Sequence, residues 1–413
     1  MKNDRSKTLA IIGQGYVGLP LAMAAVSAGW KVIGVDAIAE KVKQINIGSS
    51  PVEDISDAQL QGAIGAGTYK ATMDYSEVAN ASVITICVPT PLNSAREPDL
   101  SLLESAAESL SPFVCSETLI VSESTSYPGT LREIIIPIVE KLKPNDTKKL
   151  YFASAPERVN PGDVIWNQKN TPRLVGGIDE ESRLFAKQFY DSICDAAIQV
   201  SSPEIAEAAK LLENTFRLVN IGLINEFTQI CATKGLDVNE IIDSALTKPY
   251  GFMPFRPGVG VGGHCIPVDP LYLTWWARRN GNVASLVEAA DSINTEMPKY
   301  VAARAMAMLP TGTQNPKVLI FGVAYKPGIS DTRESPVAEL MKELRARGAE
   351  VAWNDPLVES WEKTRQVGSE WDCDIAILAT SQPGMEFEKV LKRNVPLLDC
   401  TNTLRNYPGV IAL

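Results

Sequence analysis

The segment Gly13-Gln14-Gly15-Tyr16-Val17-Gly18 constrains the fold more than any other part of the chain. It ends a short apolar run at residues 8–13 and opens a helical pattern at residues 19–28, and residues 31–36 then read as a second strand. A strand, a glycine-rich turn, a helix and another strand form a βαβ unit, which requires parallel strands and a right-handed crossover. We therefore expect the chain to begin with a parallel sheet that is covered by helices.

The three glycines of this segment also predict a ligand. They allow a tight turn and a close approach of the backbone, so that a pyrophosphate can lie at the helix N-terminus. The second strand ends in Asp36, where a carboxylate would hold a ribose 2′-hydroxyl and repel a 2′-phosphate. This favours NAD over NADP; the alternative is a structural glycine-rich turn without a ligand. The residues expected to bind NAD here are Gly13, Gly15, Tyr16, Val17, Gly18 and Asp36.

The rest of the chain predicts two sheets and a helical middle. Short apolar runs recur at residues 82–88, 118–122, 151–155 and 173–175, which indicates an open, doubly wound sheet over residues 1–202. Residues 203–234 are continuously helical, far longer than the usual ~11 to 12 residues, and such a helix spans between domains or forms a subunit interface. Further helices are expected at residues 238–246 and 283–309, a linker at 310–316, a helix at 336–347, and strands at 317–323, 350–353, 375–379 and 397–399.

We therefore predict an α/β protein with two Rossmann-like doubly wound domains that are joined by a long central helix. The expected domains are an NAD-binding domain at residues 1–202, a central helical and dimerisation region at 203–310, and a smaller α/β domain at 311–413.

The composition excludes several functions. The net charge of -10 argues against a nucleic-acid surface, and no stretch approaches the ~20 apolar residues of a membrane helix. The one histidine, His264, excludes most histidine-based zinc sites, and we expect no metal. The seven cysteines are scattered, without C-x-x-C spacing, and the charged N-terminus carries no evident secretory signal. Reduced thiols and a cytoplasmic protein are expected.

The most unusual stretch is residues 257–270, where four glycines lie in the six residues before His264 and Cys265. Glycines let the backbone fold tightly around a ligand, and Cys265 is the one side chain there that can attack it as a thiolate. The alternative, a flexible glycine loop with an incidental buried cysteine, is not excluded by the residues themselves.

A second polar group lies on the long helix. Lys210, Asn214 and Arg217 have the spacing i, i+4 and i+7 and so share one helix face. The usual reading of such a triplet is a solvated polar stripe.

Together, these motifs resemble the UDP-glucose/GDP-mannose dehydrogenase family of nucleotide-sugar 6-dehydrogenases over nearly the whole chain. Further matching pieces are Val88-Pro89-Thr90-Pro91, Ser124-Thr125, Pro156-Glu157-Arg158, the segment from Lys210 to Asn214, Tyr325-Lys326-Pro327 and the segment from Asp331 to Pro336. The resemblance implies a C-terminal domain that binds the sugar nucleotide, and it favours Cys265 as a nucleophile over an incidental cysteine.

The implied reaction is a four-electron oxidation of a primary alcohol to a carboxylate with two NAD. Cys265 would capture the C6 aldehyde as a thiohemiacetal, and oxidation would give a thioester that water hydrolyses. The competing hypotheses are a one-step hydroxyacid dehydrogenase, which needs no thiol, and a non-catalytic sensor of NAD or sugar nucleotide.

The family match also assigns roles to single residues. Lys210 and Asn214 would point at the reacting carbon, with Lys210 acting as a base or only as an electrostatic stabiliser. Glu157 matches the family's water-activating glutamate, Asp269 lies four residues beyond the nucleophile, and Thr125 resembles the threonine that contacts NAD and positions water. The match adds to the cofactor site Pro89, Thr90, Thr125 and Arg333. It gives as substrate-binding residues Arg158, Lys210, Asn214, Arg217, Tyr250, Gly258, Gly262, His264, Tyr325 and Lys326.

Departures from the family's glucose pattern point to a subgroup. Pro156-Glu157-Arg158-Val159, and the segment Gly262-Gly263-His264-Cys265 with Val268 behind it, resemble the subgroup that oxidises UDP-N-acetylhexosamines. His264 replaces a small serine there, and Arg158 adds a donor for the sugar or a partner subunit. The segment at 96–100 favours UDP-N-acetylglucosamine over UDP-N-acetylmannosamine, with UDP-glucose as the remaining alternative. A homodimer through the central helix is a further hypothesis.

Overall fold

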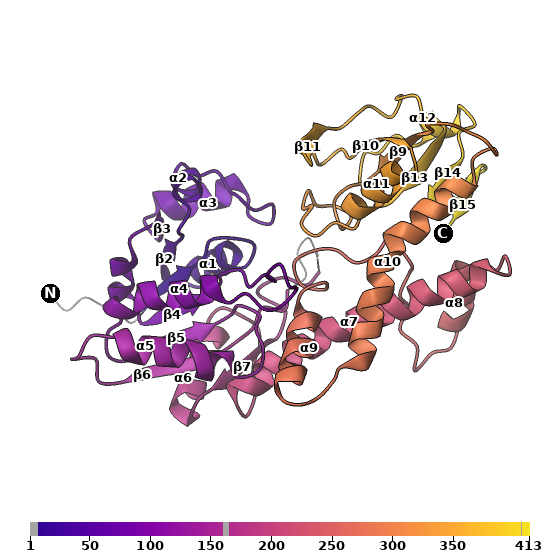
Figure 1. The fold of residues 1–413 in the computed structure, drawn as a ribbon. Coiled ribbons are helices and arrows are strands. Elements are labelled where there is room, and N and C mark those ends of the chain that lie inside the picture. The colour runs from indigo at the N-terminus through magenta and orange to yellow at the C-terminus, as the bar shows by residue number, and fades with distance from the viewer. Residues whose placement is uncertain (1–6, 160–164, 406) are drawn as a thin grey trace. The chain divides into compact units, whose positions relative to one another are not determined.

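The structure is a computed structural model that describes residues 7–159, 165–405 and 407–413 (Figure 1). The chain forms two compact units: the first holds residues 1–213 and 271–276, and the second holds 214–270 and 277–413. The charged N-terminal residues, for which we expected no secretory signal, lie mostly outside the described part. The division into three domains at residues 202 and 310 stays a prediction.

The first unit is built on an eight-stranded sheet. All its strands are parallel except at the junction of β6 and β7, which is antiparallel. The order of its first six strands is the one typical of dinucleotide-binding sheets. In spatial order, the strands are β3 (Tyr69–Thr72), β2 (Lys31–Val35), β1 (Thr8–Ile12), β4 (Val83–Ile86), β5 (Thr118–Ser122), β6 (Leu150–Ser154), β7 (Arg173–Gly177) and β8 (Ala197–Gln199).

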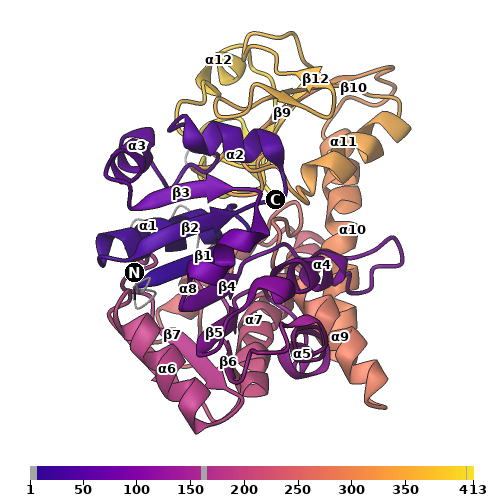
Figure 2. The same ribbon diagram turned by 90° about the vertical axis from the view of Figure 1, so that its left-hand side faces the viewer.

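Helices cover both faces of this sheet, as Figure 2 shows. Alternate residues of β1 face opposite sides, because successive side chains of a strand point to opposite faces. Leu9 and Ile11 join the core cluster that includes α1 and α6, whereas Ala10 and Ile12 join the one that includes α4 and α5. The helices are α1 (Gly18–Ser27), α2 (Ala39–Asn46), α3 (Asp57–Gly65), α4 (Ser101–Leu110), α5 (Ile136–Leu142) and α6 (Glu180–Asp191), with short helical turns η1 (Tyr75–Asn80), η2 (Ser111–Phe113) and η3 (Leu131–Ile135).

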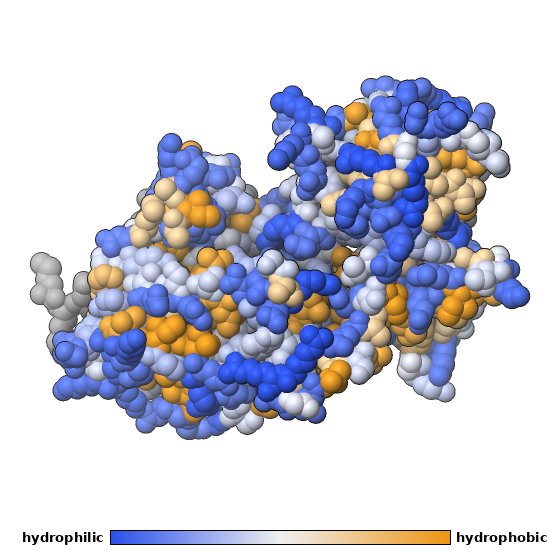
Figure 3. Space-filling view, in the orientation of Figure 1, coloured by the Kyte–Doolittle hydropathy of each residue, from blue (hydrophilic) through white to orange (hydrophobic). Residues whose placement is uncertain are grey.

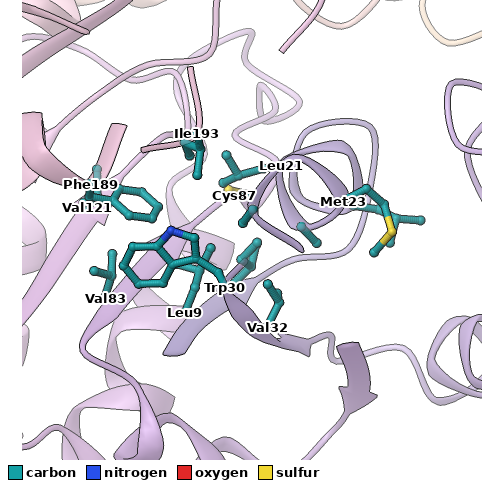
Figure 4. Close-up of a cluster of buried hydrophobic side chains, with 14 of the residues drawn as sticks. Leu9, Leu21, Met23, Trp30, Val32, Val83, Cys87, Val121, Phe189 and Ile193 are labelled. Atoms are coloured by element: carbon teal, nitrogen blue, oxygen red, sulfur yellow. The ribbon is translucent and has the colours of Figure 1, made fainter. Parts of the chain in front are cut away.

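Aromatic packing ties α6 to the strands. Figure 4 shows the indole of Trp30 beside Phe189, and their ring centroids lie 5.2 Å apart in an edge-to-face arrangement. The Trp30 indole N–H donates to Ser192 Oγ at 3.0 Å, so its one polar group is satisfied.

The second unit contains a five-stranded parallel sheet. Val318 and Ile320 of β9 pack in the cluster with α10 and α11, whereas Leu319 and Phe321 pack in the cluster on the other side. In spatial order, its strands are β10 (Glu350–Asn354), β9 (Lys317–Phe321), β13 (Ile375–Leu378), β14 (Leu397–Asp399) and β15 (Val410–Ala412). The associated elements are α10 (Ser285–Ala307), α11 (Val337–Ala346), α12 (Glu388–Leu391) and the small hairpin of β11 (Ser360–Trp361) and β12 (Thr364–Arg365).

The long helix α7 (Pro203–Ala232) has 30 residues, which confirms the expected central helix. It is followed by α8 (Val238–Leu246) and α9 (Asp269–Arg279). Within the second unit, the buried amide of Asn225 on α7 donates to Asn294 Oδ1 on α10 at 2.8 Å, and the Asn294 amide donates to the carbonyl of Leu218 at 3.1 Å. The predicted α/β class, with two Rossmann-like sheets and a long helix between them in the chain, is confirmed. Among the described residues, no helix is both long and apolar enough to cross a membrane.

A buried carboxyl group ties α7 to the first unit. Glu207 is 1% exposed, and it accepts the backbone N–H of Gly129 at 2.7 Å and that of Leu131 at 3.3 Å. Burial raises the pKa of Glu207 from its ordinary 4.5 to about 8, although the two N–H donors oppose this rise. Because the folded state holds its proton more tightly than the unfolded state does, stability should fall as the pH rises from about 4.5 to 8.

Replacing Glu207 with Gln removes this charge. The thermal midpoint of Glu207→Gln minus that of the native protein should therefore increase between pH 6 and pH 9. Each pKa unit corresponds to about 1.4 kcal/mol, so the change should amount to a few kcal/mol. Scanning fluorimetry at several pH values measures it. Glu226→Gln on the same helix is the control, because the Glu226 side chain is exposed. A parallel pH dependence for all three proteins would contradict the prediction.

Candidate functional site

The glycine-rich turn after β1 has the shape of a cradle. Gly13 has a φ of 95°, and a Cβ there would lie 2.5 Å from the carbonyl oxygen of Cys87. A Cβ on Gly18 would lie 1.8 Å from the carbonyl oxygen of Gly13. By contrast, a Cβ on Gly15 would meet nothing within 4 Å, so this glycine leaves open space beside the turn. Two glycines are thus required by packing, and the third leaves room for a pyrophosphate at the N-terminus of α1.

Asp36 lies beside this turn, at the end of β2. Its carboxylate is buried and accepts the backbone N–H of Gln14 at 2.9 Å and that of Ile38 at 3.0 Å. Lys41 Nζ, which the motif did not predict, pairs with it at 2.9 Å. The glycine-rich turn is therefore connected to Asp36 through the backbone N–H of Gln14. This donor and acceptor set fits the predicted adenosine ribose and pyrophosphate of NAD.

The loops after β4 and β5 meet next to the turn. The Thr90 hydroxyl donates to the carbonyl of Thr125 at 2.7 Å, and the Ser124 hydroxyl donates to the carbonyl of Val88 at 2.7 Å. Thr90 is buried, whereas Pro89, which lies between Val88 and Thr90 in the chain, is exposed. The structure thus brings together the predicted cofactor residues Thr90 and Thr125. This place, where the strand order reverses between β1 and β4, is the usual ligand position of such sheets.

The segment after β6 carries Glu157 and Arg158. The Glu157 carboxylate is 11% exposed and pairs with the guanidinium of Arg173 at 2.6 Å. Arg158 pairs with Glu213 of α7 at 2.6 Å and donates to the carbonyl of Pro172 at 3.0 Å. Arg158 was expected to contact the sugar or a partner subunit; within the first unit its guanidinium holds α7 against this segment.

The polar triplet of α7 divides into two kinds of residue. Lys210 is 8% exposed and Asn214 is 7% exposed, whereas Arg217 is exposed. A solvated stripe would expose all three, so the burial of the first two argues against that reading. Among the residues that the structure describes, none offers the Lys210 ammonium a hydrogen bond or ion pair. A buried ammonium without such a partner is costly unless a ligand supplies one.

The loop with the predicted nucleophile lies in the second unit. Cys265 is exposed. Its carbonyl accepts the backbone N–H of Asp269, the first residue of α9, at 2.8 Å. The Asp269 carboxylate is 2% exposed and accepts a hydrogen bond from the Asn214 amide at 2.5 Å. Three predicted catalytic residues, Cys265, Asp269 and Asn214, are thus linked by the start of α9. Because the amide donates to the carboxylate, its carbonyl oxygen and remaining N–H are oriented by a buried charge.

The double glycine of this loop packs against the C-terminal sheet domain. A Cβ on Gly262 would lie 2.7 Å from the Cβ of Tyr325 and 2.9 Å from the carbonyl oxygen of Glu334. Gly263 has a φ of 84°, and its N–H donates to the carbonyl of Arg333 at 3.1 Å. The predicted residues Gly262, Tyr325 and Arg333 are therefore brought together within the second unit.

His264 follows these glycines and is half-buried. Burial lowers the pKa of His264 below its ordinary value, and the nearby positive charge of Arg333 lowers it further. The negative charges of Asp331 and Glu334 oppose this change but do not outweigh it. The imidazole is therefore neutral at neutral pH and offers one donor and one acceptor nitrogen.

Of two further predicted substrate residues, Gly258 belongs to the glycine loop, whereas Tyr250 has no described contact with it. Gly258 donates its N–H to Asn225 Oδ1 at 3.1 Å, which anchors the loop to α7. Tyr250 is 72% exposed, with Lys248 Nζ 4.9 Å from the centre of its ring. No contact places the Tyr250 ring against the glycine loop among the described residues.

Several residues that hold these loops could not be recognised from the sequence. Gln382 donates its amide to the carbonyl of Ile329 at 3.0 Å and accepts the N–H of Gly328 at 2.7 Å. It thereby supports the segment with Lys326, whose carbonyl also accepts from the Gln382 amide at 3.3 Å. Arg173, Gln168 and Glu123 around Glu157 were missed as well. Isolated polar residues at strand ends carry no spacing pattern that would have identified them.

Comparison with known proteins gives consistent matches along the chain. It matches the three models of the UDP-glucose/GDP-mannose dehydrogenase family: the NAD binding domain over residues 7–194, the central domain over 204–296 and the UDP binding domain over 319–406.

Similar proteins cover most of the chain. A UDP-N-acetyl-D-mannosamine dehydrogenase from Methanococcus maripaludis is 37% identical over 362 residues, which are 86% of this chain and 81% of that protein. A UDP-N-acetyl-D-glucosamine 6-dehydrogenase from Pseudomonas aeruginosa is 33% identical over 367 residues, which are 87% of this chain and 85% of that protein. The solved structure of a UDP-D-ManNAc dehydrogenase from Pyrococcus horikoshii has a TM-score of 0.86 and 32% identity, and the match covers 98% of each chain.

The packing around Gly262 gives a testable prediction. In Gly262→Ala the added methyl group overlaps Tyr325 and the carbonyl of Glu334, so the loop must move. We expect the free energy of unfolding to fall by about 1–3 kcal/mol, as for other overpacked sites. Gly258→Ala is the matched control, because a Cβ there meets its first neighbour at 4.0 Å. Equal thermal midpoints for the two variants would contradict this packing.

Proposed function

Because the chain belongs to the UDP-glucose/GDP-mannose dehydrogenase family, we propose that it oxidises the C6 hydroxymethyl group of a UDP-N-acetylhexosamine to a carboxylate. The family and its NAD binding domain make the protein an NAD-dependent nucleotide-sugar dehydrogenase. The observation that carries the finer proposal is the exposed Cys265 on a glycine-rich loop, joined through the start of α9 to the buried pair of Asp269 and Asn214.

The reaction balances as one primary alcohol, two NAD+ and one water giving one carboxylate, two NADH and three protons. NAD supplies the acceptor for hydride in both oxidations. The Cys265 sulfur adds to the C6 aldehyde and forms a thiohemiacetal. Oxidation of that adduct gives a thioester, which water cleaves to the carboxylate while the sulfur leaves as the thiol. A hydroxyl nucleophile would give an ester, which is a poorer acyl donor, so this chemistry requires a thiol.

The remaining residues are proposed to stabilise the negative charge that develops on the C6 oxygen and to act on the hydrolytic water. Lys210 and Asn214 are the proposed donors to the C6 oxygen, where negative charge develops. Lys210 acts there either as the base for the first proton or only as an electrostatic stabiliser. Glu157 is the proposed carboxylate for the hydrolytic water, and Thr125 and Asp269 complete the catalytic set. With the His264 imidazole held neutral, its proposed role is a hydrogen bond to the substrate. The other proposed substrate contacts are Arg158, Arg217, Tyr250, Gly258, Gly262, Tyr325 and Lys326.

Two epimers compete as the substrate. The segment at residues 96–100 favours UDP-N-acetylglucosamine. The relative from Methanococcus maripaludis and the Pyrococcus horikoshii structure carry names of mannosamine enzymes, whereas the Pseudomonas aeruginosa relative carries the glucosamine name. The higher identity of the Methanococcus maripaludis relative, 37% against 33% for the Pseudomonas aeruginosa relative, favours the mannosamine epimer. A direct comparison of kcat/KM for both UDP-sugars decides between them. We propose the cytoplasm as its location, because the thioester chemistry needs Cys265 in its reduced form.

The stoichiometry of NADH tests the four-electron reaction. Native protein should form two NADH for each UDP-N-acetylhexosamine consumed, and Cys265→Ala should form no uronic acid, since no thioester can form. NADH absorbance and mass spectrometry of the sugar nucleotide measure both. Cys115→Ser, at a half-buried cysteine outside the glycine loop, should retain the native stoichiometry. One NADH per sugar, or full carboxylate formation by Cys265→Ala, would overturn the proposed mechanism.

A homodimer through α7 is part of the same proposal. Leu212, Phe216, Leu223 and Ile230 recur at helical spacing along α7 and are 67, 47, 57 and 57% exposed. In Figure 3, hydrophobic atoms are visible over the surface where α7 and α8 lie in Figure 1. An apolar stripe of this length on one helix is unusual for a surface that faces water, and a second copy of the same stripe would cover it.

Leu223→Glu places a charge in the middle of this stripe. We expect it to convert the dimer to a monomer in sedimentation experiments, because a buried carboxylate without a partner costs several kcal/mol. Leu184→Glu on α6, which replaces a leucine that is 44% exposed elsewhere, should leave the dimer intact. A native protein that sediments as a monomer would refute the proposal.

A further inference from the structure

A buried guanidinium lies at the edge of the first sheet where β5 and β6 end. Because β7 runs antiparallel to β6, its first residue, Arg173, lies at the carboxyl ends of these two neighbouring strands. The side chain is 2% exposed. It donates to Glu157 at 2.6 Å on one side and to Glu123 at 3.2 Å on the other. One permanent cation is thus shared by two carboxyl groups.

Glu157 receives a full set of hydrogen bonds in this arrangement. Its Oε1 accepts the backbone N–H groups of Arg158 and Val159, each at 2.6 Å. Its Oε2 accepts the amide of Gln168 and the guanidinium of Arg173, each at 2.6 Å. A carboxylate has about four acceptor sites, so protein donors occupy essentially all of them. To take up a proton, Glu157 would have to lose one of these bonds.

The charge state follows the same pattern. Burial opposes the charge of Glu157, but Arg173 and the hydrogen-bond donors outweigh it and lower the pKa of this group. Glu123 has the opposite balance: burial raises its pKa to about 7, while Arg173 opposes the rise, the charge of Glu157 adds to it and the Tyr190 hydroxyl, which donates at 2.6 Å, opposes it. The thiols of Cys87 and Cys194 face the same cluster. Near neutral pH, Glu123 therefore takes up the proton before Glu157 does.

We propose that Arg173 is a positioning residue that acts through Glu157, by fixing its carboxylate in one orientation and in its charged form. Glu123 and Tyr190 hold the guanidinium from the opposite side, and Gln168 completes the frame, since it donates to Glu157 and accepts from Arg173 at 2.8 Å. Because its acceptor sites are filled by protein donors, Glu157 then acts on the hydrolytic water through its fixed negative charge and does not remove the proton of that water. This inference rests on the proposed function, because it assigns the role of Glu157 in that reaction.

The experiment compares Arg173→Gln and Arg173→Lys with the native enzyme. Without the cation, the pKa of Glu157 should rise, because the charge of Arg173 no longer favours the ionised carboxylate. Activity that needs ionised Glu157 should then be lost at a higher pH, so the acid limb of the kcat profile moves up. A misplaced carboxylate should also lower kcat roughly tenfold to a hundredfold, with little change in KM. Arg173→Lys keeps the charge without the planar fork, so its limb should stay near the native position and its kcat should be intermediate.

Arg183→Gln is the matched control, since Arg183 lies on α6 and pairs with Glu180 at the surface. Its profile should equal the native one. A lower kcat in Arg173→Gln with an unmoved acid limb would mean a purely structural role, and an unchanged kcat would also overturn the proposal. If Arg173→Gln does not fold, Arg173→Lys decides: a fall in kcat with an unchanged KM and a native thermal midpoint supports the proposal. A native kcat, or a fall in kcat that comes with a lower midpoint, overturns it.

A second readout separates this inference from the proposed function. Carbon-13 NMR of protein with labelled glutamate carboxyl groups, assigned by Glu157→Gln, follows the titration of Glu157 without substrate. If the native protein oxidises no UDP-hexose, the proposed function fails. The effect of Arg173 on Glu157 is then still judged by whether the Glu157 resonance titrates at a higher pH in Arg173→Gln and near its native pH in Arg173→Lys.

Discussion

Parallel strand pairing is the constraint on which the rest of the structure depends. It brings the carboxyl ends of neighbouring strands to one edge of each sheet. In both sheets a glycine with a positive φ follows the first strand at this edge. Gly13 follows β1 with a φ of 95°, and a Cβ on it would lie 2.5 Å from the carbonyl of Cys87. Gly322 follows β9 with a φ of 82°, and a Cβ on it would lie 2.0 Å from the carbonyl of Thr380. In each sheet, a glycine thus lets two loops approach across the point where the strand order reverses.

The parts of the fold with strong local patterns were predictable from the sequence. The buried central strands, the glycine turn and α7 all match the expected residues to within a few positions, because strands buried on both faces are continuous apolar runs. Elements that depend on neighbours were missed. The edge strand β15 has three residues, the strands of the small hairpin have two each, and α12 has four. Such short segments form because the adjacent sheet supplies hydrogen-bond partners, and no periodicity in the sequence records that.

The candidate site divides in the same way. Cys265, Lys210, Asn214 and the glycines lie in motifs, so spacing and resemblance could identify them. Their supports could not be identified, because each support comes from a distant segment. Arg173 reads in the sequence as the first residue of an apolar strand, and only the antiparallel placement of β7 brings it to Glu157. Roles also depend on such neighbours: Arg158 was assigned to the sugar or a partner subunit, and in the fold its charge is balanced by Glu213.

The scarcity of histidine becomes meaningful once burial is known. A histidine usually provides the group that titrates near neutral pH, but here the only one has a pKa lowered by burial and by Arg333. Burial instead raises the pKa of two carboxyl groups of the first unit into this range, that of Glu123 to about 7 and that of Glu207 to about 8. Both touch the segments with predicted catalytic residues, Glu123 through Arg173 and Glu207 through the loop that follows Thr125. The pH response of such a protein is therefore set by how deeply carboxyl groups are buried, since the chain has no second imidazole to titrate.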